Sequence, residues 1–261
     1  MIDDPHTDAD TPEGLDPPTV ERLLTTTRSV RRRLDLDRPV PPGVIQRCLQ
    51  MAAHAPSANN VQTWRWIVVT DQDKRQRIAE LYRYAWQAHS AAIGGSARRR
   101  SRVEAEAHRR TLRSAQWLAD NLDRVPVHVL PCVAGRPPSE AESAQIQQGW
   151  DRDAGKLFGP DSDRSGTPEG VAALLRNAMY FGSIFPAIWS FQLALRGCGL
   201  GSTMTMVHLP FAREVAELLG IPSLVTQICL LPTAYTRGTD FAPAGRRDAE
   251  GLTYWNGWNG R

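Results

Sequence analysis

Two arginines and a serine lie close together early in the chain, in the run Arg28-Ser29-Val30-Arg31. A guanidinium group binds a phosphate oxyanion through two parallel hydrogen bonds, and a serine hydroxyl adds a further donor. These side chains therefore suit a phosphate monoester. The alternative is a solvated basic patch, because arginine clusters are common on protein surfaces.

Turn-forming residues and amides gather in a second run, Ala55-Pro56-Ser57-Ala58-Asn59-Asn60. A carboxamide donates and accepts hydrogen bonds at once, which suits the edge of a heterocycle that carries carbonyl and N–H groups side by side. The alternative is a turn that ends a helix and needs no ligand.

A glycine-rich run, Gly197-Cys198-Gly199-Leu200-Gly201-Ser202, has a spacing close to that of a dinucleotide-binding fingerprint. That fingerprint needs a strand before it and a helix after it. Here a predicted helix precedes the run and an extended segment follows it, which excludes a Rossmann site. The glycines let the backbone approach a flat ligand, or they cap the preceding helix.

No residues are spaced as a nucleophile and its base, so we assign no catalytic side chain. Late in the chain, Arg246 and Arg247 supply two further cations, or are an exposed pair in the tail. The four cysteines form no C-x-x-C pair, which predicts neither a metal site nor a disulfide framework. We expect buried, inert thiols in a reducing compartment.

Composition narrows the class of protein. The chain has 261 residues, and its net charge of +3 is small for a nucleic-acid-binding protein. The acidic start is not a signal peptide, and we find no apolar stretch of roughly 18 residues. We therefore expect a cytoplasmic protein that binds neither nucleic acid nor a membrane.

Hydrophobic spacing predicts the elements that position these residues. Helical spacing covers 19–27, 42–54, most of 74–122, 171–195 and 211–219. Strands are predicted at 64–70, 125–133 and 225–235, with an extended segment at 199–207. The polar stretch 135–170 is predicted to be a long surface loop or a lid. Long helices between strands, without regular alternation, favour the α+β class.

With these runs in view, the chain resembles the nitroreductase family of flavoproteins. Arg28 to Arg31 resembles that family's R-S-x-R phosphate motif, and residues 56–64 resemble its P-S-x-x-N-x-Q-P-W turn, with Thr63 in place of the proline. Residues 193–202 are similar to its L-A-A-x-x-x-G-L-G segment. Leu219-Gly220-Ile221-Pro222 and the late arginine pair follow in the expected order. The similarity covers Thr25 to about Trp258, and two aromatic segments, 180–189 and 254–258, resemble an actinobacterial branch.

The resemblance implies a mostly antiparallel central sheet flanked by helices, in an intertwined homodimer with FMN at the subunit interface. Residues 19–261 would form one FMN-binding domain after a disordered segment 1–18, with a long insertion or lid around 88–170. The resemblance also implies cofactor-binding residues, which are Arg28, Ser29, Arg31, Pro56, Ser57, Ala58, Asn60, Ser202, Thr203, Met204, Thr205, Arg246 and Arg247.

The activity that the resemblance implies is transfer of a hydride from NADPH or NADH, through FMN, to a nitroaromatic, a quinone or a similar flat acceptor. One alternative is a nicotinamide-independent flavoenzyme of the same fold: a substrate oxidase or dehydrogenase, a dehalogenase, or a flavin-cleaving enzyme. A second is a noncatalytic flavin-binding protein. A third, a nucleic-acid-binding regulator, is disfavoured because the basic runs lack interleaved aromatic residues.

Overall fold

The computed structural model describes residues 16–94, 102–158 and 171–258, which fall into two compact units. The larger unit spans 29–238 and contains the sheet. The smaller unit joins the N-terminal 28 residues to residues 239–261. In the smaller unit, Arg28 donates from Nη1 to the carbonyl oxygen of Ala242 at 3.2 Å. The rings of Tyr254 and Trp258 stack there with centroids 4.5 Å apart.

The first described helix, α1 (Pro17–Thr26), begins two residues before the start that the spacing predicts. Asp16 caps it, because its Oδ2 accepts from the backbone N–H of Thr19 at 3.0 Å. Prolines occupy the first helical positions, where a missing N–H costs nothing. Most of the segment 1–18 that we predict to be disordered lies outside the described residues.

Five strands form one antiparallel sheet in the described part of the larger unit. They are β1 (Trp64–Val69), β2 (Val127–Ala134), β3 (Leu200–Ser202), β4 (Val225–Gln227) and β5 (Leu231–Tyr235). The order is β1-β2-β5-β3, and β4 also pairs with β2. β2 is central, and nearly all its side chains are buried, as its unbroken apolar run predicts.

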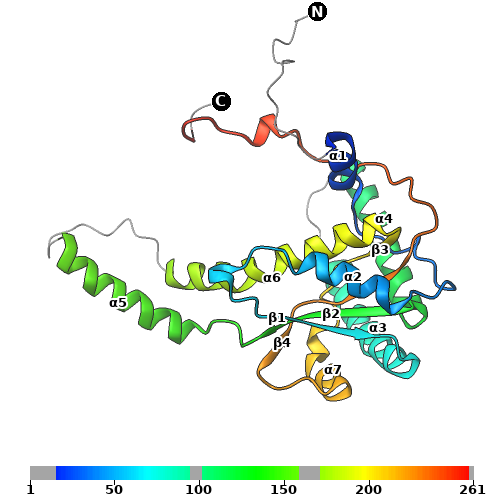
Figure 1. Ribbon diagram of the computed structural model, residues 1–261, viewed down its shortest axis with the longest axis horizontal. Helices are drawn as coiled ribbons and strands as arrows, with labels where there is room; N and C mark the ends of the chain where they lie inside the picture. The colour runs from blue at the N-terminus through cyan, green and yellow to red at the C-terminus, as the bar shows by residue number, and fades with distance from the viewer. Residues whose placement is uncertain (1–15, 95–101, 159–170, 259–261) are drawn as a thin grey trace, which may run out of the picture. The chain divides into compact units, whose positions relative to one another are not determined.

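Helices cover both faces of this sheet (Figure 1). α2 (Pro42–Ala52) and α6 (Val171–Gly197) pack together on one face, over a core that includes Ile45, Val129, Val133, Ile188 and Phe191. α3 (Gln72–Gly94) and α7 (Ala212–Leu219) lie on the other face, and α4 (Arg102–Asn121) packs on α3. Three short 3₁₀ turns join them: η1 (Ala58–Asn60), η2 (Leu122–Arg124) and η3 (Leu209–Phe211). A fourth, η4 (Glu250–Leu252), lies in the smaller unit. The predicted α+β fold with a flanked antiparallel sheet is confirmed.

A helix occupies much of the predicted loop at 135–170, so that prediction was wrong there. α5 (Glu140–Phe158) begins with a capping box, in which the N–H of Glu142 donates to Ser139 Oγ at 3.3 Å. The N–H of Ser139 donates in return to Glu142 Oε2 at 3.2 Å. α5 packs against the start of α6, where the N–H of Ala172 donates to Gln147 Oε1. The rest of the predicted loop, 159–170, lies outside the described residues.

The predicted strand 225–235 is two strands, because a β-bulge divides it. Cys132 lies opposite Gln227 and Val129 lies opposite Leu231, so three steps along β2 correspond to four along its partner. The extra residue turns Leu230 toward Thr205, and the two exchange backbone hydrogen bonds of 2.8 and 3.0 Å. The bulge thereby connects the sheet to the segment that follows β3.

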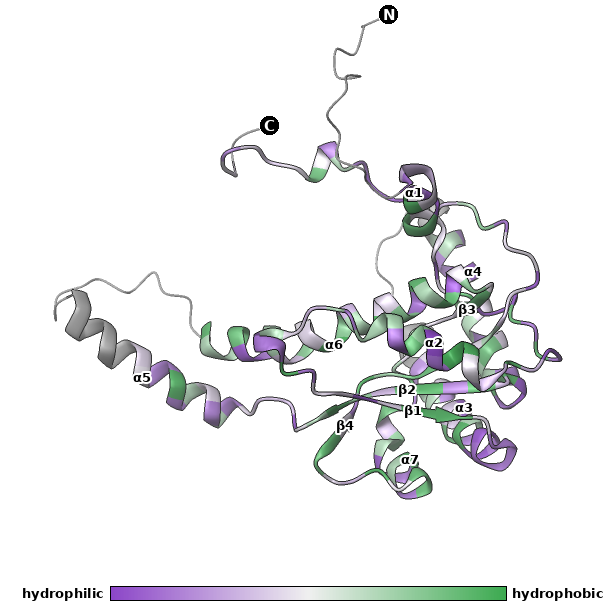
Figure 2. Ribbon diagram, viewed as in Figure 1, coloured by the Kyte–Doolittle hydropathy of each residue, from purple (hydrophilic) through white to green (hydrophobic). Residues whose placement is uncertain are grey.

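α6 is apolar on more than one face, as Figure 2 shows along much of its length. By length and composition alone it is long enough to cross a membrane. Its second half, however, packs on α2 and the sheet, with Ile184, Ile188 and Leu195 buried. Its first half leaves Leu174 69% exposed and Leu175 45% exposed. The described chain alone therefore does not cover this helix.

Two buried histidines lie beneath the sheet on the face opposite α6. His128 Nε2 lies 2.9 Å from the carbonyl oxygen of Leu122, and His208 lies just before η3. Burial is the main cause that lowers the pKa of each imidazole to about 4, and for His128 the nearby Arg75 guanidinium contributes to that value. Both rings are therefore neutral in the folded chain at neutral pH.

We expect the free energy of unfolding to fall as the pH drops from about 6.5 to about 4. In that window the unfolded chain takes up protons on both histidines, while the folded chain does not. The loss approaches about 3 kcal/mol for each histidine. Urea unfolding at several pH values should show a shallower dependence for His208→Gln. A control substitution of an exposed histidine, His54→Gln, should follow the wild type, and equal slopes in all three proteins would contradict the assignment.

Candidate functional site

The arginine motif and the glycine-rich run, about 170 residues apart in the sequence, lie against each other. The backbone N–H of Val30 donates to the carbonyl oxygen of Ser202 at 2.8 Å. On the opposite side of this contact, the N–H of Thr236 donates to the carbonyl oxygen of Gly199 at 3.1 Å. The structure thus brings Ser29 and Arg31 next to the segment Ser202–Thr205.

Gly201 allows this close approach. A Cβ atom added there would lie 2.7 Å from Thr236 Cγ2 and 2.9 Å from Val30 Cβ, which is inside van der Waals contact. A side chain at this position would force the side chains of Val30 and Thr236 to move away. Gly199, which precedes it, has a φ of +74°, a conformation that glycine adopts without strain. Gly201 therefore serves close packing against other segments of the chain, a role that the sequence did not predict.

Arg31 is a partly buried cation for which the described residues supply no carboxylate. Burial lowers the pKa of its guanidinium. The neighbouring carboxylates are engaged elsewhere, since Arg237 contacts both Asp35 and Asp37, at 3.7 and 3.2 Å, and Arg124 also contacts Asp37 at 3.2 Å. A buried cation without a counter-ion is costly, so Arg31 is suited to receive an anion.

Tyr82 of α3 connects Arg31 to the segment after β3. Its hydroxyl lies 3.0 Å from Thr205 Oγ1, and its side chain is almost fully buried. Burial raises the pKa of Tyr82, while the positive charge of Arg31 lowers it. The phenol is therefore neutral, and it fixes the hydroxyl of Thr205 beside the cation.

The hydroxyls at the end of β3 differ in their partners. Ser202 Oγ accepts from Gln192 Nε2 of α6 at 3.0 Å. Thr203 is fully buried, and its Oγ1 has no hydrogen-bond partner among the described residues. Met204 is 37% exposed. Because buried hydroxyls are almost always paired, the unpaired Thr203 hydroxyl indicates a polar group that the described chain itself does not provide.

The turn that contains Pro56 and Ser57 is held against α6. The N–H of Ala58 donates to Ser183 Oγ at 3.0 Å, and Ser183 in turn donates to the carbonyl oxygen of Met179. Asn59 and Asn60 have φ angles of +51° and +54°, and Gln62 follows with +48°. Left-handed conformations at several non-glycine residues store strain, which concentrates at binding sites. Asn60 also accepts at Oδ1 from Gln62 Nε2 at 2.8 Å.

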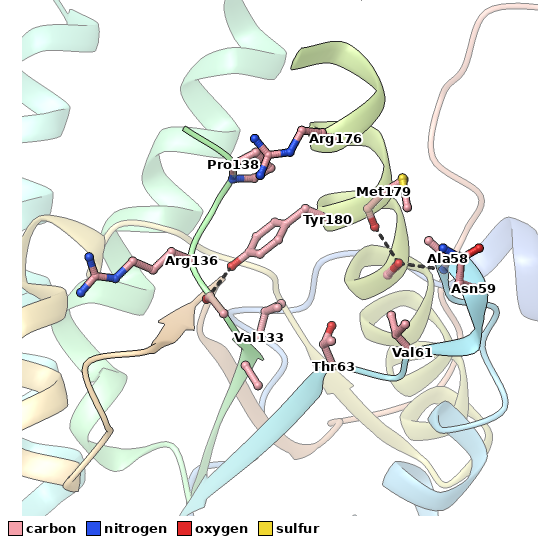
Figure 3. Close-up of a pocket in the computed structure, with 13 residues that line it drawn as sticks. Ala58, Asn59, Val61, Thr63, Val133, Arg136, Pro138, Arg176, Met179 and Tyr180 are labelled. Carbon is pink, nitrogen blue, oxygen red and sulfur yellow. Dashed lines mark hydrogen bonds between the residues drawn. The ribbon is translucent and has the colours of Figure 1, made fainter. Parts of the chain in front are cut away.

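A pocket of about 310 Å³ opens beside this turn (Figure 3). Ala58, Val61 and Thr63 line one side, and Val133 and Gly135 lie at the end of β2. Tyr180 of α6 crosses the pocket and donates to the carbonyl oxygen of Gly135 at 3.3 Å. Arg176 lies at the rim and pairs with Glu142 of α5 at 2.9 Å. The walls are largely apolar.

The predicted site residues fall into separate groups in the single chain. Ser202 is bonded to α6 at Gln192, whereas the Pro56–Asn60 turn is bonded to it at Ser183. These positions are nine residues apart on the helix, about 13 Å along its axis. Arg28, Arg246 and Arg247 belong to the smaller unit. Sequence reasoning missed Tyr82, Ser183 and Gln192, although the last two stand out as polar residues within an apolar helix.

Comparison with known proteins finds a match to the family that the sequence motifs resemble, and the match covers most of the chain. The model of the family described as "Nitroreductase family" matches residues 24–235. An NADH dehydrogenase from Thermus thermophilus is 27% identical over 229 residues, which are 87% of this chain and 91% of that protein.

Solved structures show the same fold at lower identity. A BluB-like flavoprotein from Clostridium difficile 630 superposes with a TM-score of 0.61 at 17% identity, covering 93% of this chain and 99% of the other. An iodotyrosine deiodinase bound to FMN and 3-iodo-L-tyrosine superposes with a TM-score of 0.56 at 20% identity, covering 86% and 93%.

Gly201→Ala should destabilise the protein by about 1–3 kcal/mol, because its methyl group overlaps Val30 and Thr236. Thermal unfolding of the variant measures this loss. Gly43→Ala is the matched control, since a Cβ at Gly43 in α2 meets nothing within 4 Å. The control should unfold at the wild-type temperature or slightly above it. Equal stability of the two variants would refute the close approach at Gly201.

Proposed function

The chain belongs to the nitroreductase family, and on that premise we propose that it is an FMN-dependent oxidoreductase. It passes a hydride from NADPH or NADH, through bound FMN, to a flat acceptor such as a nitroaromatic or a quinone. The observation that carries this proposal is Arg31, a partly buried cation whose counter-ion is absent from the described residues. The terminal phosphate of FMN is an anion of the right kind for it.

The residues around Arg31 fit FMN. Ser29 is exposed next to Arg31 and would donate to the phosphate. The resemblance to the family's motifs implies that Arg28 and one or both of Arg246 and Arg247 would also contact the phosphate. The segment Ser202–Thr205 would approach the isoalloxazine ring, where the unpaired hydroxyl of Thr203 supports a polar contact. Tyr82 and Gln192 would keep that segment in place, because each holds one of its hydroxyl groups.

FMN, when bound, supplies the hydride chemistry, so the chain needs no acid–base pair of its own. The tasks left to the chain are to orient the cofactor and to stabilise negative charge with fixed donors. The guanidinium of Arg31 would be such a donor.

We propose that the working form is a homodimer, with each FMN between two copies. The exposed apolar side chains of α6, among them Leu174 and Leu175, support an interface that buries this helix. The distance between Ser183 and Gln192, about 13 Å along α6, also supports a dimer, because it separates the two groups of predicted site residues within one chain. The Pro56–Asn60 turn of one copy would then line the FMN held by Arg31 of the other.

We propose the cytoplasm as the compartment of this protein, and its four free cysteines support this proposal.

The absorption spectrum of the purified protein tests the function. We expect a flavin spectrum that bleaches when NADPH or NADH is added without oxygen, and that returns on adding a quinone. A flavin that stays oxidised would contradict the use of nicotinamide and favour a nicotinamide-independent relative. A protein that neither carries FMN nor takes it up would overturn the proposal.

Arg31→Ala should weaken FMN binding about 10- to 100-fold, because it removes a charge-assisted contact to the phosphate. Fluorescence titration of the apoprotein with FMN measures the affinity. Arg32→Ala, which removes the adjacent and exposed guanidinium, is the control and should bind FMN nearly as the wild type does. If the two variants retain FMN equally well, Arg31 does not hold the phosphate.

A further inference from the structure

Two cysteines that are 150 positions apart in the sequence touch in the fold. The Sγ atoms of Cys48 and Cys198 lie 3.8 Å apart. Cys48 is in the middle of α2 and fully buried, while Cys198 follows the end of α6 and is partly exposed. The sequence predicts only separate, inert thiols. The structure shows instead a pair in which one of the two residues is partly exposed.

The surroundings of the pair allow a bond to form. A disulfide requires the two sulfur atoms to approach by about 1.8 Å more. Cys48 is fixed by the packing of α2 on α6, but Cys198 lies between Gly197 and Gly199 in the turn that ends α6. Its N–H bonds to the carbonyl oxygens of Ala194 and Leu195, and a Cβ added at either flanking glycine would meet nothing within 4 Å, so the turn is ordered and has space on both sides of Cys198. Rotation of the Cys198 side chain is the small movement required.

We propose that Cys48 and Cys198 are a redox-active pair, which hydrogen peroxide converts into a reversible disulfide between α2 and the glycine-rich turn. The thiol of Cys198 gives up its proton and its sulfur attacks one peroxide oxygen; the O–O bond breaks, a sulfenic acid forms, and the hydroxide that leaves takes up that proton as water. The sulfur of Cys48 then displaces the sulfenic oxygen, which leaves as water. Two thiols are oxidised and one peroxide is reduced to two waters.

The order of these steps follows from burial. Burial and the neighbouring Cys198 thiol raise the pKa of Cys48 to about 12, and Arg47 lowers it by less. Cys48 is thus a poor first nucleophile, and its place beside Cys198 makes it the resolving partner. The other two thiols, Cys132 and Cys229, are fully buried in the sheet region, where burial raises both pKa values.

The disulfide would affect the candidate functional site through the backbone between Cys198 and Ser202. Cys198 is two residues before β3, and the intervening Gly199 accepts from Thr236. A covalent link to α2 would fix the turn from which Gly201 and Ser202 extend. It would also close a loop of 150 positions, which restricts the unfolded chain and raises Tm. The inference stands on the thiol geometry and does not depend on the proposed function.

Peptide mapping of the full-length protein tests it. Trypsin places each cysteine in a different peptide, with Cys48 in 48–65 and Cys198 in 197–213. After treatment with hydrogen peroxide, alkylation and digestion, we expect these two peptides joined and lighter by two hydrogen atoms. Free thiols should fall from four to two, Tm should rise by several degrees, and dithiothreitol should reverse each change.

Two variants separate this pair from oxidation in general. Cys198→Ser should abolish the joined peptide and keep three free thiols, whereas Cys229→Ser should still form it. The wild-type map alone is sufficient if a variant fails to fold. A joined peptide that contains Cys132 or Cys229 would overturn the proposal. So would a link between two chains, or a Cys198 peptide that gains oxygen without forming a link.

Discussion

The backbone of Val30 lies directly on the backbone at Gly201 and Ser202, and the arrangement of the candidate site depends on this contact. One hydrogen bond of 2.8 Å connects the two segments, and the absence of a side chain at Gly201 makes room for it. The contact orders Arg31 on one side and Thr203 on the other. Thr236 approaches the same glycine, so segments from the start and the end of the sheet unit meet at Gly201.

The sequence carries clear information on the elements of this arrangement. Periodic apolar residues predict α2, α6 and α7, and an unbroken apolar run predicts β2 as a central strand. Gly220, with a φ of +67°, ends α7 as its position predicts. The order of the five motifs gives the family and, with it, the antiparallel sheet. The roles of the predicted cofactor residues remain predictions.

The features that the sequence does not reveal depend on pairing between residues far apart in the chain, or on patterns of only a few residues. The capping box at Ser139 and Glu142 is a local signal of a helix, but it lies in a polar stretch that hides it. The bulge between β4 and β5 depends on the register against β2, which no local pattern encodes. Tyr82 has no distinguishing neighbours in its helix, and only folding brings it to Thr205. The contact between Cys48 and Cys198 is equally invisible in a linear reading.

The strand order has a consequence for how the chain comes to be folded. β5 lies between β2 and β3 in the sheet, yet it is made after both of them. During synthesis, one edge of β2 therefore stays unpaired until β5 has been made. Unpaired strand edges pair readily with other chains, which leads to aggregation. The sheet closes only once Leu231–Tyr235 has left the ribosome. Helices α5, α6 and α7 emerge in the meantime, and α6 covers one apolar face of β2 before its missing neighbour arrives.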